Sequence, residues 1–203
     1  MAFVSNTWYL ESTYKLSQAT MLSYGNTLYI FGLQKYDYYK NYGNLVYLTV
    51  SETLPPLNES LNKQYLDIIS THFLIHADVL YVVYRTVNSV KLDKFNWTTK
   101  QLLSSTTVVL GLTSNESDLV LQMNNAILEV YYMDFVTNTL KILLSRDYGN
   151  TWTSTINVIN MVNGFFDLEF IKDKIRGLVS EGSVYYSEFN LLEPSPYGVI
   201  PDM

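Results

Sequence analysis

Two carboxylates, Asp167 and Glu169, lie two residues apart in the run Phe165-Phe166-Asp167-Leu168-Glu169-Phe170-Ile171. The aromatic and aliphatic residues around them predict a β-strand, and residues two apart on a strand share one face. Two acidic groups about 5–10 Å apart can cleave a glycosidic bond. The same groups could bind a ligand or simply line a solvated channel, and we favour the lining interpretation. Asp118 and Glu129 are further candidate carboxylates by position.

No metal site and no cofactor is expected. The two histidines, His72 and His76, lie four residues apart on a predicted strand, which separates them by about 13 Å. The chain has no cysteine, so disulfides, thiolate metal ligands and cysteine nucleophiles are excluded. It also lacks a glycine-rich phosphate loop and a nucleophile elbow.

Short apolar runs separated by turn residues recur along the chain and predict many antiparallel strands. Four strand–turn–strand units repeat, and in each of them the second strand begins with an equivalent aliphatic residue. These residues are Leu28, Leu80, Leu128 and Ile175. Their spacing of about 50 residues is typical of the four-stranded blades of a β-propeller. The sequence therefore predicts an all-β fold, a small four-bladed β-propeller.

The predicted propeller is a single domain over residues 1–203. Its blades are expected at about 19–60, 66–103, 113–157 and 163–189, followed by a tail at 190–203. The fourth strand of the first blade is predicted to be poor, because Pro55-Pro56 interrupts it.

The last blade lacks a fourth strand of its own, and the N-terminus is expected to supply it. Trp8, Trp97 and Trp152 each follow or adjoin Asn and Thr, and each is predicted to begin a fourth strand. Residues 4–12 would then complete the last blade and close the ring, which protects otherwise open sheet edges.

One local motif, Ser145-Arg146-Asp147-Tyr148-Gly149-Asn150-Thr151-Trp152, matches the pattern S-x-D-x-G-x-T-W at every fixed position. It resembles the Asp-box (BNR) repeat of sialidase-type propellers. The resemblance implies a structural hairpin between the third and fourth strands of a blade, built on Ser145, Asp147, Gly149, Thr151 and Trp152, and no catalytic residue. A shortened version is expected at Asp93-Lys94-Phe95-Asn96-Trp97.

The same resemblance implies that a sialidase would need three arginines for the substrate carboxylate. This chain has only Arg85, Arg146 and Arg176, and Arg146 lies inside the Asp-box. The sequence therefore argues against a sialidase.

A tyrosine-rich stretch between two predicted strands is a candidate recognition surface for a glycan or a protein. It contains Tyr36, Tyr38, Tyr39 and Tyr42 among Asn, Lys and Gly, residues common in binding loops. An exposed hairpin without a ligand is the alternative.

The composition of the chain argues against some classes of binding partner. The formal net charge of −6 argues against nucleic acid, and no apolar run is long enough to span a membrane. No secretory signal is apparent, and localisation stays open; the composition resembles that of some viral surface proteins. We therefore expect a non-enzymatic binding or assembly module, with a virion or a cell surface as a candidate location and a carbohydrate-active hydrolase as the alternative function.

Overall fold

The computed structural model describes residues 16–35, 42–50, 57–112, 119–134, 139–153, 156–160, 165–171, 174–180 and 184–190. Over these residues the chain forms β-strands and turns, with no helix and hence no helix that could cross a membrane. The strands form four antiparallel sheets, named A to D here in chain order.

Within each sheet the strands follow one another in chain order, each paired with the next. Sheet A holds β1 (Leu16–Tyr24), β2 (Thr27–Lys35), β3 (Tyr42–Val50) and β4 (Leu57–Leu66). Sheet B holds β5 (Ser70–His76), β6 (Val79–Arg85), β7 (Ser89–Asn96) and β8 (Leu102–Leu110). Sheet C holds β9 (Leu119–Asn124), β10 (Ile127–Asp134), β11 (Thr139–Ser145) and β12 (Ile156–Asn160). Sheet D holds β13 (Phe165–Ile171), β14 (Lys174–Ser180) and β15 (Val184–Asn190).

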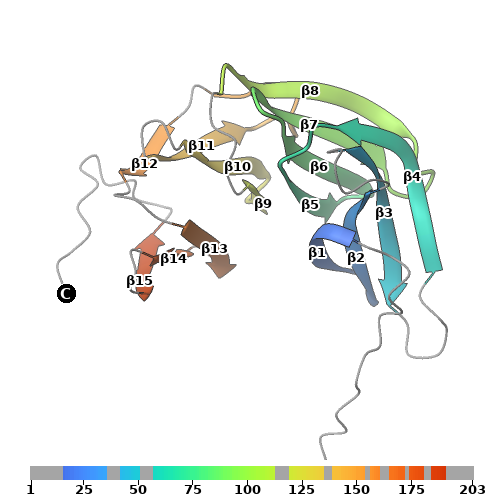
Figure 1. Ribbon diagram of the computed structural model, residues 1–203, viewed down its shortest axis with the longest axis horizontal. Helices are drawn as coiled ribbons and strands as arrows, with labels where there is room; N and C mark the ends of the chain where they lie inside the picture. The colour runs from blue at the N-terminus through green and yellow to red at the C-terminus, as the bar shows by residue number, and fades with distance from the viewer. Residues whose placement is uncertain are drawn as a thin grey trace, which may run out of the picture.

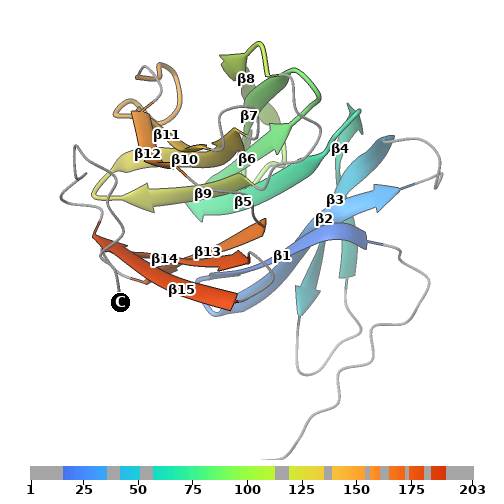
Figure 2. The same ribbon diagram turned by 60° about the vertical axis from the view of Figure 1, so that its left-hand side comes forward.

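The sheets are arranged as an arc, with sheet B between A and C and sheet D on the far side of C (Figures 1 and 2). The first strand of each sheet lies toward the middle of the molecule, and β4, β8 and β12 lie toward the outside (Figure 1). The arrangement is of the propeller type, but the sheets do not form a closed ring.

The predicted repeat is visible in the strand register. Leu28, Leu80, Leu128 and Ile175 are each the second residue of the second strand in their sheets, and each pairs with the next-to-last residue of the first strand. Two of the connecting turns, Ala77-Asp78 and Asn125-Ala126, have positive φ at both residues. Tight hairpins require this conformation, because it matches the twist of the paired strands.

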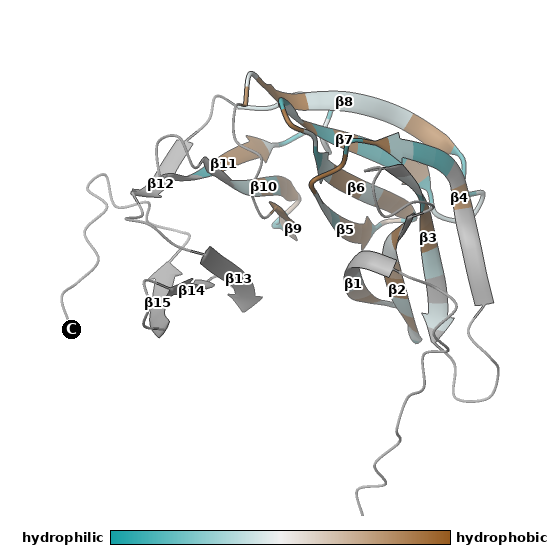
Figure 3. Ribbon diagram, viewed as in Figure 1, coloured by the Kyte–Doolittle hydropathy of each residue, from teal (hydrophilic) through white to brown (hydrophobic). Residues whose placement is uncertain are grey.

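Side chains pack between consecutive sheets rather than around one central core. The core between sheets A and B (core AB) includes Phe31, Phe73, Leu80 and Trp97, and the core between sheets B and C (core BC) includes Leu92, Leu121, Leu128 and Val130. Figure 3 shows the hydrophobic colour on β5 and β6, which contribute to both cores, and a pale middle of β8 at the outside. Sheet B thus buries both of its faces.

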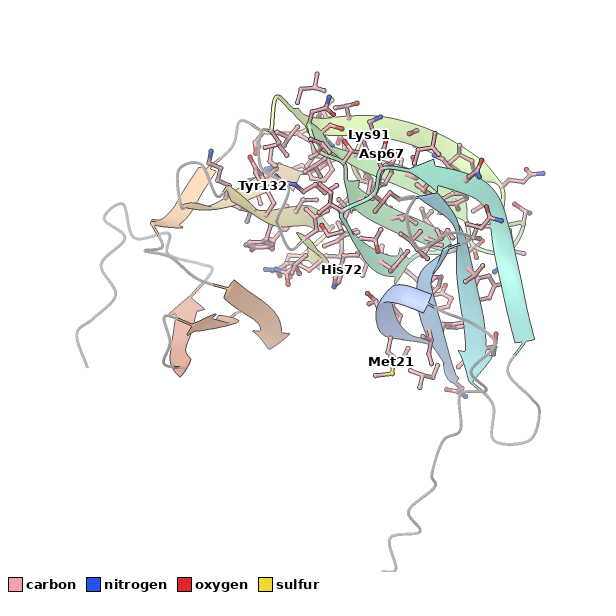
Figure 4. The ribbon with its side chains drawn as sticks, in the orientation of Figure 1. Met21, Asp67, His72, Lys91 and Tyr132 are labelled. Atoms are coloured by element: carbon pink, nitrogen blue, oxygen red, sulfur yellow. The ribbon has the colours of Figure 1, made fainter. Side chains whose placement is uncertain are left out.

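The outward face of sheet A has no such partner. Met21 and Leu28 are 68% and 39% exposed, whereas Leu80, at the position in sheet B equivalent to Leu28, is 0% exposed. Figure 4 shows Met21 pointing away from sheet B. This face therefore carries apolar residues at positions that pack between sheets elsewhere, but here they are exposed to solvent.

Three strand predictions were wrong. A ten-residue strand, β4, forms directly after Pro56, because the prolines precede it rather than interrupt it. Trp97 and Trp152 lie in the connections before the fourth strands and do not begin them, since β8 starts at Leu102 and β12 at Ile156. Residues 4–12, including Trp8, lie outside the described residues, as does the tail from 191 onward.

His72 makes the contact between sheets B and C sensitive to pH. Its Nδ1 accepts a hydrogen bond of 3.4 Å from the backbone N–H of Leu121, which requires the unprotonated nitrogen. Burial lowers the pKa of His72 to about 4, below the value of 6.5 expected in an unfolded chain. The unfolded state therefore binds the proton more readily.

We expect the His72 contribution to the free energy of unfolding to be complete above pH 6.5 and to disappear as the pH falls to about 4. A shift of this size corresponds to a loss of about 3 kcal/mol at most. Urea unfolding measured at several pH values should show this slope for the wild type and lack it for His72→Gln. Equal slopes between pH 6.5 and 5, where most carboxylates stay ionised, would contradict the prediction.

Candidate functional site

The sheets have two distinct ends. At one end, called the Asp-box end, lie the turn between the first and second strands and the connection between the third and fourth strands. At the opposite end, called the crossover end, lie the β6–β7 turn and the crossings to the next sheet at 67–69 and 111–112. The Asp-box ends of sheets B and C lie side by side. Two hydrogen bonds show this: Lys94 Nζ, near the end of β7, donates to Tyr148 O and to Asn150 Oδ1, which follow the end of β11.

Asp147 organises the Asp-box turn after β11. Its Oδ1 accepts hydrogen bonds from Ser145 Oγ (2.7 Å) and from the N–H groups of Asn150 (3.1 Å) and Thr151 (2.9 Å), while Oδ2 accepts from Thr151 Oγ1 (2.6 Å). The Thr151 hydroxyl, followed by the Thr151 N–H and Ser145, holds the pKa of Asp147 well below its usual range. The carboxylate is therefore fully engaged inside its own turn.

The same turn packs against the neighbouring sheet. Gly149 has a φ of +84°, and a Cβ at this position would lie 2.4 Å from Leu92 Cδ2 of sheet B. Trp152 packs against core BC. Trp97 has the corresponding place in core AB, with its ring 5.1 Å from that of Tyr29 in an edge-on arrangement. Each of these connections therefore packs its tryptophan against the preceding sheet.

The predicted shortened box was misassigned. Asp93 lies within β7 rather than in a turn, and its carboxylate is completely buried. The turn after β7 uses Asn96 instead, whose Oδ1 accepts a hydrogen bond of 2.7 Å from the N–H of Thr99. A side-chain amide can cap a turn in the same way as a carboxylate, which explains why the pattern looked similar.

Asp93 links sheets A and B through a buried polar cluster. Its Oδ2 accepts hydrogen bonds from Lys63 Nζ (2.5 Å) and Tyr65 Oη (2.7 Å), both on β4. Burial, followed by the charge of Asp93, raises the pKa of Tyr84 to about 12. Since its charge is paired and it lies between packed sheets, this cluster is a structural contact.

A second buried carboxylate, Glu129 on β10, was considered in the sequence only by its position. Its Oε2 accepts hydrogen bonds from Tyr131 Oη (2.9 Å) and from Gln122 Nε2 on β9. Glu129 is 7% exposed and Tyr131 is 0% exposed. The sequence carried a signal for this cluster, because Glu129 is an acidic residue between the aliphatic Leu128 and Val130 of the same strand.

The other candidate residues are only partly placed. Asp167 and Glu169 lie on β13, paired in register with Leu178 and Arg176, and only their backbones are described. Tyr36, Tyr38 and Tyr39 lie outside the described residues. Tyr42 begins β3 opposite Leu66, at the crossover end. Over the described part of the chain, no group of three or more metal-binding side chains is present.

No family model and no curated protein sequence matches this chain. Solved structures that resemble its fold include two carbohydrate-active enzymes. An exo-β-1,3-galactanase from Phanerochaete chrysosporium, with β-1,3-galactotriose, aligns with a TM-score of 0.55 and 13% identity over 83% of this chain and 44% of the galactanase. A Hadza microbial sialidase aligns with a TM-score of 0.51 and 12% identity over 82% of this chain and 35% of the sialidase.

The chain thus spans less than half of either neighbour. At these identities the comparison concerns the fold alone. Together with the antiparallel sheets, it identifies a propeller-type fold of the kind that these two carbohydrate-active enzymes have.

We predict that Gly149→Ala lowers the free energy of unfolding by about 2–4 kcal/mol, because it combines a left-handed backbone with a close contact to Leu92. The matched control is Gly25→Ala, which has a φ of +60° but no atom within 4 Å of the added Cβ, and should cost only about 1–2 kcal/mol. Denaturant unfolding of both variants measures the difference. Equal losses would show that the contact between the Asp-box turn and sheet B contributes nothing.

Proposed function

We propose that this chain is a carbohydrate-active hydrolase that acts on neutral glycans. The observation that carries the proposal is its propeller-type fold, which it has in common with a galactanase and a sialidase. This favours the enzymatic alternative over the non-enzymatic binding module that the sequence first suggested.

The charges of the chain favour a neutral substrate over a sialic acid. Arg85 is buried at the end of β6, at the crossover end, whereas Arg146 is exposed at the Asp-box end. These two side chains lie at opposite ends of the sheets and cannot converge on one carboxylate. With three arginines in all and a net charge of −6, the chain is poorly suited to bind an anionic sugar.

The proposed catalytic carboxylates are on β13. Asp167 and Glu169 lie on the first strand of sheet D, and the first strands lie toward the middle of the molecule (Figure 1). A glycosidase needs at least one carboxyl group there that can give a proton to the leaving oxygen.

We expect the wild-type protein to release sugar from β-1,3-galactotriose or another neutral oligosaccharide. Asp167→Asn or Glu169→Gln should lower kcat at least about 100-fold, because each removes a candidate proton donor. Asp67→Asn, which changes an exposed carboxylate in the crossing after β4, is the matched control. Product analysis by chromatography over a glycan panel is the measurement, and no release from any neutral glycan would refute the proposal.

Glycan or protein binding without turnover is the second candidate function. Tyr42 lies at the crossover end, opposite the structural Asp-box turns, and the tyrosine-rich stretch 36–42 runs up to it. A protein that binds neutral glycans on an array but hydrolyses none of them would support this candidate. The proposal also allows a virion or cell-surface location for such a module.

We further propose that the four sheets are the four blades of a ring that the N-terminal segment closes. Sheet D has three strands where sheets A, B and C have four, and the outward face of sheet A is exposed at Met21 and Leu28. Residues 4–12 would add the missing strand to β15, around Trp8, and bring sheet D against sheet A. A full sheet D would then cover the open face.

Deletion of residues 1–12 should therefore lower the melting temperature by several degrees, because it exposes the edge of β15 and leaves sheet A uncovered. Deletion of residues 197–203 is the control of similar kind at the other terminus. A synthetic peptide of residues 1–15 should restore the stability of the shortened chain. An unchanged melting temperature after the N-terminal deletion would rule out the closure.

A further inference from the structure

The outer edge of sheet B is formed by β8, the last strand of that sheet among the described residues. It lies at the outside of the molecule (Figure 1). An edge strand presents a row of backbone N–H and C=O groups with which another strand can pair. Natural proteins block such an edge with charged residues, a proline, a very short strand or a covering segment.

The sequence of β8 contains no blocking residue. Its nine residues read Leu-Leu-Ser-Ser-Thr-Thr-Val-Val-Leu, without a charge or a proline. The last strands of the other sheets differ from it, since β4 carries Glu59 and Lys63, β12 has only five residues and β15 carries Glu188. Among the last strands that the structure describes, β8 alone is both long and uncharged.

Both ends of β8 are apolar and open to solvent. Leu102 and Leu103 at its beginning are 47% and 55% exposed, and Leu110 at its end is 75% exposed. Figure 3 shows the hydrophobic colour at the two ends of the strand and a pale middle. Exposed apolar side chains gathered on one element are typical of a surface that binds a partner.

The middle of β8 is a regular strand. Residues Ser104 to Thr107 pair without a break with Lys94 to Lys91 of β7, and the two register shifts lie on either side of this segment. Irregularities of this kind bend a strand and can turn its edge away from a partner. Because they flank the middle of β8, the segment that can pair regularly is centred on Ser105 and Thr106.

We propose that the outer edge of β8 binds β8 of a second copy of this chain, antiparallel to it, about a two-fold axis at Thr106. In a two-fold dimer the same surface meets itself, so the strand must be complementary to itself. An uncharged strand meets this condition, because no like charges face each other. Leu102 and Leu110 both lie four residues from Thr106, so the apolar end of one strand meets the apolar end of the other.

The expected dimer is weak. Stable interfaces bury more than about 1,000 Å² in total, whereas two paired edge strands contribute mainly backbone hydrogen bonds and the exposed leucines. We therefore expect a Kd on the order of 10–100 μM. The first strands of the sheets lie away from β8 (Figure 1), so the dimer does not depend on the proposed hydrolase function.

Sedimentation velocity between about 1 and 500 μM protein tests the proposal, since this range spans the expected Kd. The mass of the wild type should rise from 23.4 kDa toward twice that value. Thr106→Lys should raise the Kd at least about fivefold, because two ammonium groups then face each other at the axis. Thr99→Lys, in the exposed turn before β8, is the matched control and should dimerise like the wild type.

A mixture of opposite charges tests the two-fold register. Thr106→Lys and Thr106→Glu should each dimerise poorly alone, and together they should form a mixed dimer at least as tight as that of the wild type. Thr107→Lys, on the exposed opposite face of β8, is the second variant if the melting temperature shows that Thr106→Lys does not fold. A mixture that binds no more tightly than either variant alone would contradict the register.

Hydrogen exchange shows what covers the edge. Amides of residues 103–109 should become more protected as the protein concentration rises through the Kd. A wild type that stays monomeric at about 500 μM overturns the proposal. So does a dimer that Thr106→Lys and Thr107→Lys leave unchanged, because a different surface then forms it. Full protection of both edges of β8 in the monomer would show that another segment of the same chain covers the strand, and would also overturn it.

Discussion

The packing of each sheet against the next is the interaction on which this structure depends. A four-stranded sheet has two faces, and an isolated apolar face in water is unfavourable by about 25 cal/mol for each Å² left exposed. Sheet B resolves this by burying one face in core AB and the other in core BC. The Asp-box turn and the turn after β7 strengthen the same contacts, since Trp152 and Trp97 pack against the preceding sheets.

Because the sheets are stabilised by packing on one another, a residue that does not fit the packing at an equivalent position needs an explanation. Leu80 and Leu128 are fully buried between sheets, whereas Leu28 at the same position is partly exposed, which identifies the outward face of sheet A as an unfilled contact. Glu129 departs in the opposite way, as a charged side chain at a position that holds a core tyrosine elsewhere. Asp93 accepts two hydrogen bonds on Oδ2 and lies in the contact between sheets A and B, and Asp147 accepts hydrogen bonds on both oxygens within its own turn.

The two ends of the sheets divide these roles. The Asp-box end is occupied by turns whose polar atoms bond to one another, as in Asp147, Ser145 and Thr151. This is consistent with the structural role that the resemblance to Asp-box repeats implies. The carboxylates of interest lie within the strands of sheets C and D instead, on β10 and β13.

By itself, the sequence determined the first three strands of each sheet and the repeat, but not the fourth strands. Alternation and turn residues predicted β-strands, and the spacing of Leu28, Leu80, Leu128 and Ile175 placed equivalent residues in equivalent register, because both signals are local and recur along the chain. The turn formed by residues 145–152 could also be predicted from the sequence, since its hydrogen bonds join residues that are close in the chain. Only the tertiary structure decided which carboxylates are buried and which side chains donate hydrogen bonds to them. Asp93 meets Lys63 and Tyr65 from another sheet, and Glu129 faces away from the core that its neighbours Leu128 and Val130 form. Those contacts depend on how one sheet lies on the next, which no local pattern in the sequence encodes.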